Sequence, residues 1–117
     1  MGAERAAAVK RGEIWTASGA PGYGSKPRPA LIVQSDVLAE TDSILTCGFT
    51  AQPDNERYFR PQIFASSDNG LGRTSHVMTE KLTAIPRAKL GKRVGKLTDE
   101  DMEAVERALH LVLGFAG

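Results

Sequence analysis

The sequence predicts a mainly β domain whose short antiparallel strands form a small barrel or a strongly curved sheet, with one C-terminal helix packed on it. Three observations support this fold class. Short runs of β-branched and aliphatic residues alternate with glycine- and proline-rich segments. The last part of the chain spaces its apolar residues as a helix does. The length of 117 residues fits one domain around a single core.

Strands are predicted first in the amino-terminal half. Residues 13–17 form a short strand, and residues 18–25, with three glycines and a proline, form a flexible loop of the kind that often covers a site. The aliphatic run 30–33 is typical of a buried strand, and 43–50 is another strand. Between them, residues 35–41 form one helical turn.

The second half begins with a short strand at 60–65, where Pro61 favours an edge position or a strand start. Residues 66–72 contain Asn-Gly and form a turn. The loosely alternating segment 75–85 is expected to be one long, bent strand, and residues 86–92 lead from it to the final element.

That final element is an amphipathic helix. Thr98 is a suitable N-cap, acidic residues follow it in the first turn, and Gly114 can end the helix. Its apolar stripe is predicted to pack on the core, and consists of Met102, Val105, Leu109, Val112 and Leu113.

Composition narrows the class of protein. We expect a mobile leader at 1–9 and one domain at 10–117. A cytoplasmic location is expected because no run of residues is long and apolar enough to span a membrane or direct secretion. The single cysteine, Cys47, lies in an apolar stretch and is predicted to be a buried thiol. Because the sequence contains only two histidines, His76 and His110, in addition to this cysteine, we expect no bound metal and no cofactor. His110 is assigned a structural role.

Charge is uneven along the chain although the formal net charge is only +1. Residues 1–35 carry five basic and two acidic side chains, and residues 57–93 carry eight and two. These two regions form one basic face if the fold brings them together; otherwise they are ordinary solvated loops.

Arg28 lies between Pro27 and Pro29, immediately before the buried run 30–33. Proline fixes its own φ angle and disfavours helical angles in the residue before it, so the backbone around Arg28 is stiff and extended. A guanidinium held at the mouth of a strand suits bidentate binding of a phosphate, although pairing with a nearby carboxylate is an equal alternative from this stretch alone.

Several motifs together resemble the MazF/PemK toxin family. They occur in the family's order and spacing over residues 10–113, and are KRGEIW at 10–15, KPRPALIV at 26–33, GFT at 48–50, SHVMTEKLTAI at 75–85, KL at 89–90 and VGKL at 94–97. The resemblance implies an SH3-like barrel that forms a homodimer, cleaves single-stranded RNA at selected sequences without metal, and is inhibited by an antitoxin. We expect the acidic or apolar disordered tail of that antitoxin to cover the Arg28 site.

The resemblance also assigns catalytic residues. The family's arginine, threonine and acidic positions match Arg28, Thr50 and Glu80. Three departures are notable. Ala51 stands where many members have serine, Met78 stands where plasmid-borne members have a second arginine, and the family's histidine has no counterpart in residues 16–25.

These residues suggest a mechanism in which the RNA's own 2′-hydroxyl attacks the adjacent phosphate, leaving a 2′,3′-cyclic phosphate and a 5′-hydroxyl. Arg28 stabilises charge on the non-bridging oxygens, Thr50 hydrogen-bonds the same phosphate, and Glu80 is the expected general base. A guanidinium is a poor acid. His76, or the Arg28 site as a whole, is therefore considered for protonating the leaving oxygen.

Other residues are predicted to bind RNA. Tyr23, and with it Phe59, is expected to stack on unpaired bases, and His76 to contact phosphate, while Trp15 fills the core. Basic side chains are expected to follow the RNA backbone, and these are Lys26, Arg57, Arg60, Arg73 and Lys81.

Two other functions are compatible with the same fold. A CcdB-like toxin binds a topoisomerase and cuts nothing, and the apolar C-terminal sequence HLVLGFAG at 110–117 suits such a contact. A non-enzymatic SH3-like adaptor is the third alternative. The positions of Arg28 and Thr50 favour RNA cleavage over both.

Overall fold

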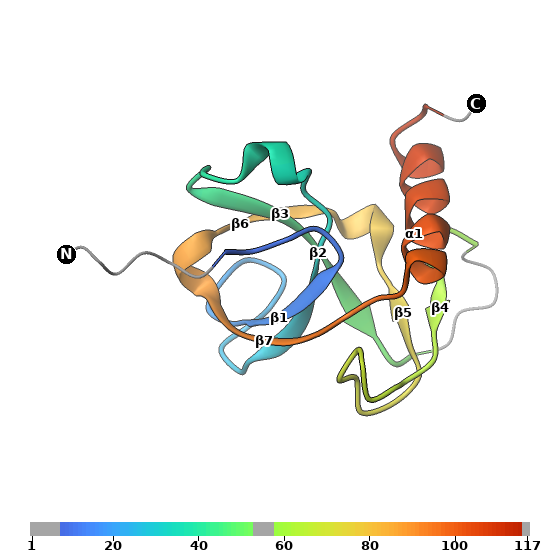
Figure 1. Cartoon of the computed structure of the whole chain (residues 1–117), viewed down its shortest axis with the longest axis horizontal. Helices are drawn as coiled ribbons and strands as arrows, with labels where there is room; N and C mark the ends of the chain where they lie inside the picture. The colour runs from blue at the N-terminus through green and yellow to red at the C-terminus, as the bar shows by residue number, and fades with distance from the viewer. Residues whose placement is uncertain (1–7, 53–57, 116–117) are drawn as a thin grey trace.

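The computed structural model describes residues 8–52 and 58–115, which form a curved antiparallel sheet with one α-helix beside it (Figure 1). In chain order these residues form β1 (Glu13–Ala17), β2 (Arg28–Ile32), the 3₁₀ turn η1 (Asp36–Leu38), β3 (Ser43–Thr50), β4 (Gln62–Ile63), β5 (Ser75–Val77), η2 (Thr79–Lys81), β6 (Thr83–Pro86), η3 (Arg87–Lys89), β7 (Leu90–Lys96) and α1 (Asp99–Val112). The sheet order is β4-β5-β3-β2-β1-β7, and β6 also pairs with β3. The predicted fold class is confirmed.

The first half follows the prediction closely. The bounds of β1 and β3 are those expected, and η1 lies in the segment predicted to turn. β2 begins at Arg28 and so includes Pro29, which is paired with Thr16 of β1 at the start of the strand, where proline is tolerated. β4 is shorter than the predicted 60–65 and spans only two residues.

The prediction of one long strand over 75–85 is wrong, because β5 and β6 are separated by η2. Both strands pair with β3 but in different registers. Thr46 pairs with Thr83 and Phe49 pairs with Val77, so three residues along β3 face six along its partner. The 3₁₀ turn absorbs the extra residues, and the buried Thr79 hydroxyl within it donates to the carbonyl of Phe59.

Strand β7 was not predicted, because its sequence LGKRVGK is charged and contains two glycines. The structure shows why glycine is needed there. A Cβ atom at Gly91 would lie 2.3 Å from Oγ1 of Thr16, and one at Gly95 would lie 2.4 Å from backbone atoms of Asn69. Close approach of neighbouring chain segments, rather than strand propensity, therefore determines the residues at these two positions.

The predicted helix is confirmed as α1. The Thr98 hydroxyl accepts a hydrogen bond from the Asp101 amide at 3.0 Å, and Gly114 follows the helix with a φ of +83°. Val105 and Leu109 are buried as predicted. The prediction for Leu113 is wrong, because this side chain is 49% exposed beyond the last helical turn.

Two cores lie on opposite faces of the sheet. The main core lies between the sheet and α1, and it includes Ile14, Leu31, Cys47, Ile63, Val77, Val105 and Leu109. The second core forms on the other face, where Tyr23 of the loop before β2 and Ile85 of β6 pack with Ala17 and Ala30. Trp15 is buried on this second face, as predicted, against Ile32 and Ile44.

Cys47 is a fully buried thiol, as predicted. Burial, together with the nearby negative charge of Glu80, raises the pKa of its thiol to about 12. Among the described residues, no helix is long and apolar enough to cross a membrane. The mobile leader at 1–9 stays a prediction, because residues 1–7 lie outside those described.

Candidate active site

Arg28 is the first residue of β2, and the two prolines flank it there. Its backbone is fixed by pairing with Ala17 of β1. The side chain is exposed, and within the described part of the chain its guanidinium has no hydrogen bond or ion pair. The structure therefore presents a cation on a restrained backbone at the surface.

Thr50 is the last residue of the neighbouring strand β3, at the end of the strand pair where Arg28 begins β2. The pairing of β2 with β3 ends at Ala30 and Gly48, so Arg28 and Thr50 each lie two residues beyond the last pair, at the same end of the two strands. Thr50 pairs in turn with His76 of β5, and His76 pairs with Gln62 of β4. We call this set, Arg28, Thr50, His76 and Gln62, the site row.

The site row lies on the face of the sheet opposite the main core. Along β3, Cys47 and Phe49 pack in or against the main core, so the alternating residues Thr46, Gly48 and Thr50 point the other way. A Cβ atom at Gly48 would lie 3.2 Å from Cε of Met78, beside the Tyr23 ring. Glycine thus allows Met78, at the position where an arginine is expected in plasmid-borne members, to pack closely against β3 at residue 48.

Tyr23 is part of this packing and is only 4% exposed. Its hydroxyl lies 2.9 Å from Oγ1 of Thr46. Burial raises the pKa of Tyr23, although the hydrogen bond with Thr46 partly opposes that shift. The structure corrects the expectation that this ring stacks on RNA bases, because the ring belongs to the second core.

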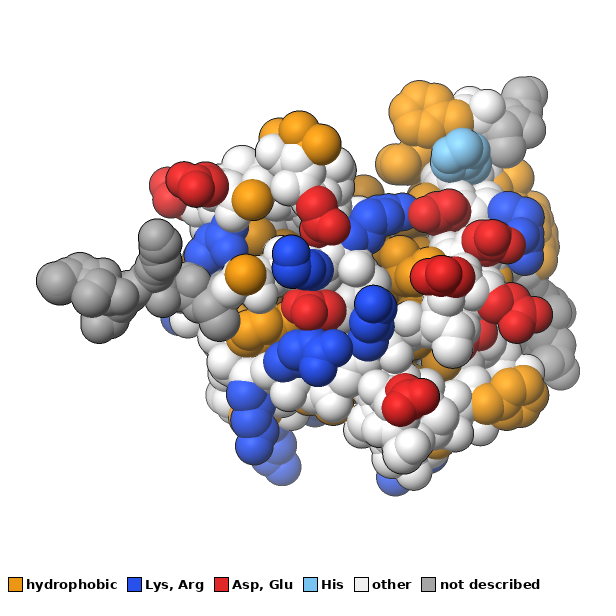
Figure 2. Space-filling model, viewed as in Figure 1, with side chains coloured by type: hydrophobic (Ala, Val, Ile, Leu, Met, Phe, Trp, Pro, Cys, Tyr) orange, Lys and Arg blue, Asp and Glu red, His pale blue; other side chains and the backbone are white. Residues whose placement is uncertain are grey.

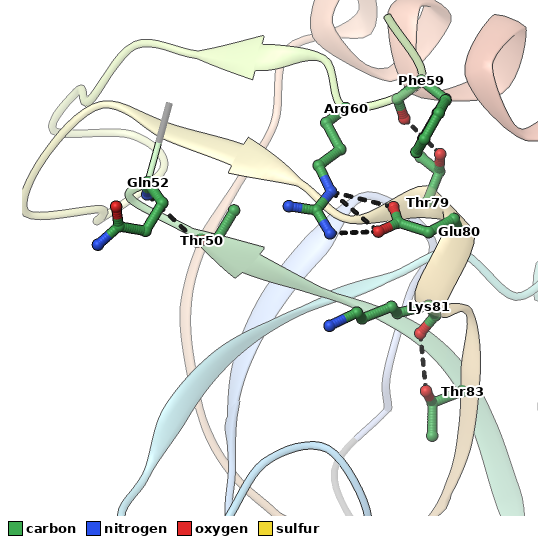
Figure 3. A network of polar contacts seen from close by, with 8 residues as sticks. All are labelled: Thr50, Gln52, Phe59, Arg60, Thr79, Glu80, Lys81 and Thr83. Carbon is green, nitrogen blue, oxygen red and sulfur yellow. Dashed lines mark hydrogen bonds and ion pairs between the residues drawn. The ribbon is translucent and has the colours of Figure 1, made fainter. Parts of the chain in front are cut away.

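Thr50 is half-buried, and its Oγ1 accepts a hydrogen bond from the backbone amide of Gln52 at 3.2 Å (Figure 3). This contact uses the hydroxyl as an acceptor. Its own hydrogen can then be directed toward an anion, since a hydroxyl both donates and accepts.

Glu80 lies in η2 and forms an ion pair with Arg60 (Figure 3). Nε of Arg60 donates to both carboxylate oxygens, at 3.1 and 2.9 Å, and a second guanidinium nitrogen also donates to Oε2. The two side chains are 11% and 23% exposed. Two residues predicted for different roles, catalysis and RNA binding, are therefore brought together as one structural pair.

His76 is half-buried at the centre of the site row. Its Nδ1 is buried and has no hydrogen-bond partner among the described residues. Since a buried donor without an acceptor is unfavourable, Nδ1 is best left unprotonated and the ring hydrogen placed on Nε2.

The remaining predicted RNA contacts differ in their placement. Lys26, Arg73 and Lys81 are exposed, whereas Arg57 lies outside the described residues. Phe59 is half-buried and packs edge-on against Tyr58, with ring centroids 5.7 Å apart. Tyr58, which the sequence analysis missed, is 78% exposed and is the more accessible ring.

A further basic surface lies over β1 and β7, where Figure 2 shows several Lys and Arg side chains close together. Lys92, Arg93 and Lys96 of β7 are exposed there, and Arg93 forms an ion pair with Glu13 at 3.0 Å. Because β7 was not predicted from the sequence, this basic surface was not predicted either. Within the described residues, no three His, Cys, Asp or Glu side chains are grouped closely enough to hold a metal ion.

Comparison with known proteins identifies the family. Residues 10–113 match the model of the PemK-like, MazF-like toxin of type II toxin-antitoxin systems. The chain belongs to this family. The resemblance inferred from the motifs is thereby confirmed over nearly all of the sequence.

Individual relatives agree with that assignment. The chain is 38% identical over 109 residues to a probable endoribonuclease MazF of Mycolicibacterium smegmatis, covering 93% of this chain and all of the relative. It is 28% identical to endoribonuclease EndoA of Bacillus subtilis, covering 90% and 94%. Its fold is similar to that of a mycobacterial endoribonuclease solved in complex with its cognate antitoxin, with a TM-score of 0.77, 22% identity, and coverage of 94% and 99%.

Proposed function

We propose that this toxin is an endoribonuclease that cleaves single-stranded RNA at the Arg28 end of the site row. The observation that carries the proposal is the exposed Arg28 guanidinium on the strand end next to Thr50. Two donors on neighbouring strand ends suit a phosphate, and the endoribonuclease names of the two relatives support RNA as the substrate.

The proposed reaction is an internal transfer of the phosphoryl group. The RNA's 2′-oxygen forms a bond to phosphorus, the bond from phosphorus to the 5′-oxygen breaks, and the products carry a 2′,3′-cyclic phosphate and a 5′-hydroxyl. Arg28 stabilises the charge that develops on the non-bridging oxygens, and the Thr50 hydroxyl donates to the same phosphate. No step of this reaction uses a metal ion or a cofactor.

Proton transfer is the part of the mechanism that the structure changes most. Both Glu80 oxygens already accept hydrogen bonds from Arg60, so we assign Glu80 to holding Arg60 and η2 in place instead of serving as the base. His76 is the ionisable side chain beside Thr50. Because its Nδ1 is buried, Nε2–H is the donor we assign to a hydrogen bond with the leaving 5′-oxygen. Water accepts the proton of the 2′-hydroxyl and supplies the proton that the leaving 5′-oxygen takes up.

Around the cleaved bond, the exposed Lys26, Arg73 and Lys81 contact the RNA backbone in this proposal. Such contacts make binding weaken steeply as salt rises. Selectivity for particular RNA sequences and assembly as a homodimer also remain part of the proposal, as does a cytoplasmic location.

A cognate antitoxin completes the proposal, since the family consists of toxins of type II toxin-antitoxin systems. Its disordered tail, acidic or apolar, covers the Arg28 site and excludes RNA. The test is competition between a tail peptide and labelled RNA. A tail that binds the toxin while RNA binding is unchanged would contradict this arrangement.

Cleavage is tested by incubating the purified toxin with single-stranded RNA in EDTA and analysing the product ends. We expect 5′-hydroxyl ends, which polynucleotide kinase labels without prior phosphatase treatment, and 3′ ends that stay blocked until the cyclic phosphate is opened. Arg28→Ala should lower the rate by about 10²–10³. The matched control is Arg107→Ala, which removes an exposed arginine from α1. Intact RNA, or 5′-phosphate ends, would refute the proposal.

A second candidate function is topoisomerase binding without cleavage. It is favoured by the exposed apolar side chains at the C-terminal end of α1, which are Leu111, Leu113 and Phe115 at 42%, 49% and 76% exposure. Figure 2 shows hydrophobic side chains beside a histidine at this end of the molecule. Intact RNA combined with inhibition of topoisomerase activity would favour this function.

A further inference from the structure

Phe64 is an exposed aromatic residue directly after the edge strand β4. Its side chain is 70% exposed. Ile63 of β4 is fully buried in the main core, whereas Gln62 before it and Phe64 just after the strand are exposed, as expected of side chains on the opposite face. That face is the one that carries His76, the pairing partner of Gln62. Phe64 thus extends the face of the site row beyond its last strand.

The backbone of Phe64 is fixed although its ring is not covered. Nδ2 of Asn69 donates to the Phe64 carbonyl at 2.9 Å. Asn69 is itself only 3% exposed, and its Oδ1 accepts hydrogen bonds from the amides of Ser66 and Leu71 at 3.0 and 2.9 Å. A large apolar ring on such a rigid turn gains stability when a flat apolar surface covers it.

We infer that Phe64 is a stacking platform for one nucleobase of the RNA substrate, an inference that rests on the proposed function. Three strand spacings separate the Arg28 position from β4, which is about 14 Å, and Phe64 lies about 7 Å further along β4 than Gln62. The stacked base therefore belongs to a nucleotide beyond the two that flank the cleaved bond. Arg73, exposed two residues before β5, is a cation available to the RNA backbone where it leaves this part of the sheet.

RNA is favoured over a protein partner here because the turn that follows the ring is polar. Its residues Ser66, Ser67 and Asp68 are exposed. An exposed ring with polar neighbours suits a base on its flat side. Binding of an antitoxin segment at Phe64 is the competing outcome.

The experiment is an abasic scan. A mapped RNA substrate is prepared with one abasic nucleotide at each position in turn, and kcat and KM are measured for wild type, Phe64→Ala and Phe64→Trp. Phe115→Ala is the matched control, because Phe115 is 76% exposed at the far end of α1. For wild type, one abasic position away from the cleaved bond should raise KM on the order of 10-fold. Phe64→Ala should raise KM for intact RNA by the same factor and leave kcat unchanged. Its KM should not rise further when the abasic nucleotide occupies that position. Phe64→Trp should behave as wild type.

Binding of the same RNA with 2′-O-methyl groups, which cannot be cleaved, separates this inference from the proposed function. If wild type does not cleave RNA but the abasic effect on binding depends on Phe64, the proposed function fails and the platform stands. If wild type cleaves RNA and Phe64→Ala matches Phe115→Ala at every position, the platform is refuted. It is also refuted if Phe64→Ala weakens only antitoxin binding, or if no RNA binds.

Discussion

The two faces of strand β3 differ in what their side chains do. On one face, Cys47 is fully buried and Phe49 packs against the main core beneath α1. On the other, Thr46 and Gly48 contact Tyr23, and the alternation ends at the half-exposed Thr50. The strand is thus packed on both faces from Thr46 to Phe49, whereas Ser43 and Leu45 near its start are exposed and Thr50 at its end is partly accessible. Substitutions should therefore separate stability from activity according to position along a strand as well as face.

The largest effect should come from the buried part of β2. Leu31→Ala removes a fully buried side chain three residues from Arg28, and should lower the free energy of unfolding by about 2–5 kcal/mol. Urea denaturation measures this loss. The cleavage rate per folded molecule should be unchanged, and a large fall in that rate would show that the core also sets the geometry of the site.

At the accessible end of β3 the pattern should reverse. Thr50→Val keeps the shape of the side chain but removes the hydroxyl, and a lost hydrogen bond to a charged phosphate corresponds to roughly 10- to 100-fold in rate. Thermal unfolding should change little, because this hydroxyl's one hydrogen bond among the described residues is with the exposed Gln52. An unchanged kcat would remove Thr50 from the mechanism.

The ion pair of Arg60 and Glu80 offers a sharper version of the comparison. If Glu80 only positions Arg60, Glu80→Gln should lower stability by about 1 kcal/mol, because the charged carboxylate that accepts from Arg60 is replaced by a neutral amide. Its cleavage rate should stay within about threefold of wild type. A general base contributes typically 10²–10⁴ in rate, so a loss of that size would restore Glu80 to a catalytic role.

The smallest effect is expected at Tyr23. Tyr23→Phe removes the hydrogen bond to Thr46 but keeps the ring in the second core, and should reduce stability by about 1 kcal/mol or less, because Thr46 also donates to the carbonyl of Thr83. Cleavage should not change. Phe64→Ala, at the surface, should leave stability unchanged and raise KM for RNA. The two aromatic residues thus compare the buried and accessible parts of one face.

The sequence predicts what depends on local pattern. The bounds of β1 and β3, the turn at η1 and the capped helix α1 follow from β propensity, turn residues and helical spacing, and the structure confirms them. β7 could not be predicted in this way. Its glycines are required by contacts with Thr16 and Asn69, which are distant in the sequence.

The candidate site shows the same division. The stiffness around Arg28 is visible from its flanking prolines, but its position next to Thr50 depends on the pairing of β2 with β3. The burial of Tyr23 and the pairing of Arg60 with Glu80 depend on tertiary packing, because each partner lies at least twenty residues away. The glycine-rich composition of residues 18–25 and the basic charge of residues 57–93 indicated surface roles for these side chains. Tertiary packing overrode that local pattern.

The central claim is that Arg28 and Thr50 act on one phosphate. The most direct test is a double-mutant cycle of cleavage rates for wild type, Arg28→Ala, Thr50→Val and the double variant, with folding checked by thermal unfolding. Two donors to the same phosphate are coupled, so the double variant should be slowed by clearly less than the product of the two single effects. Effects that multiply fully in a folded protein would contradict the claim.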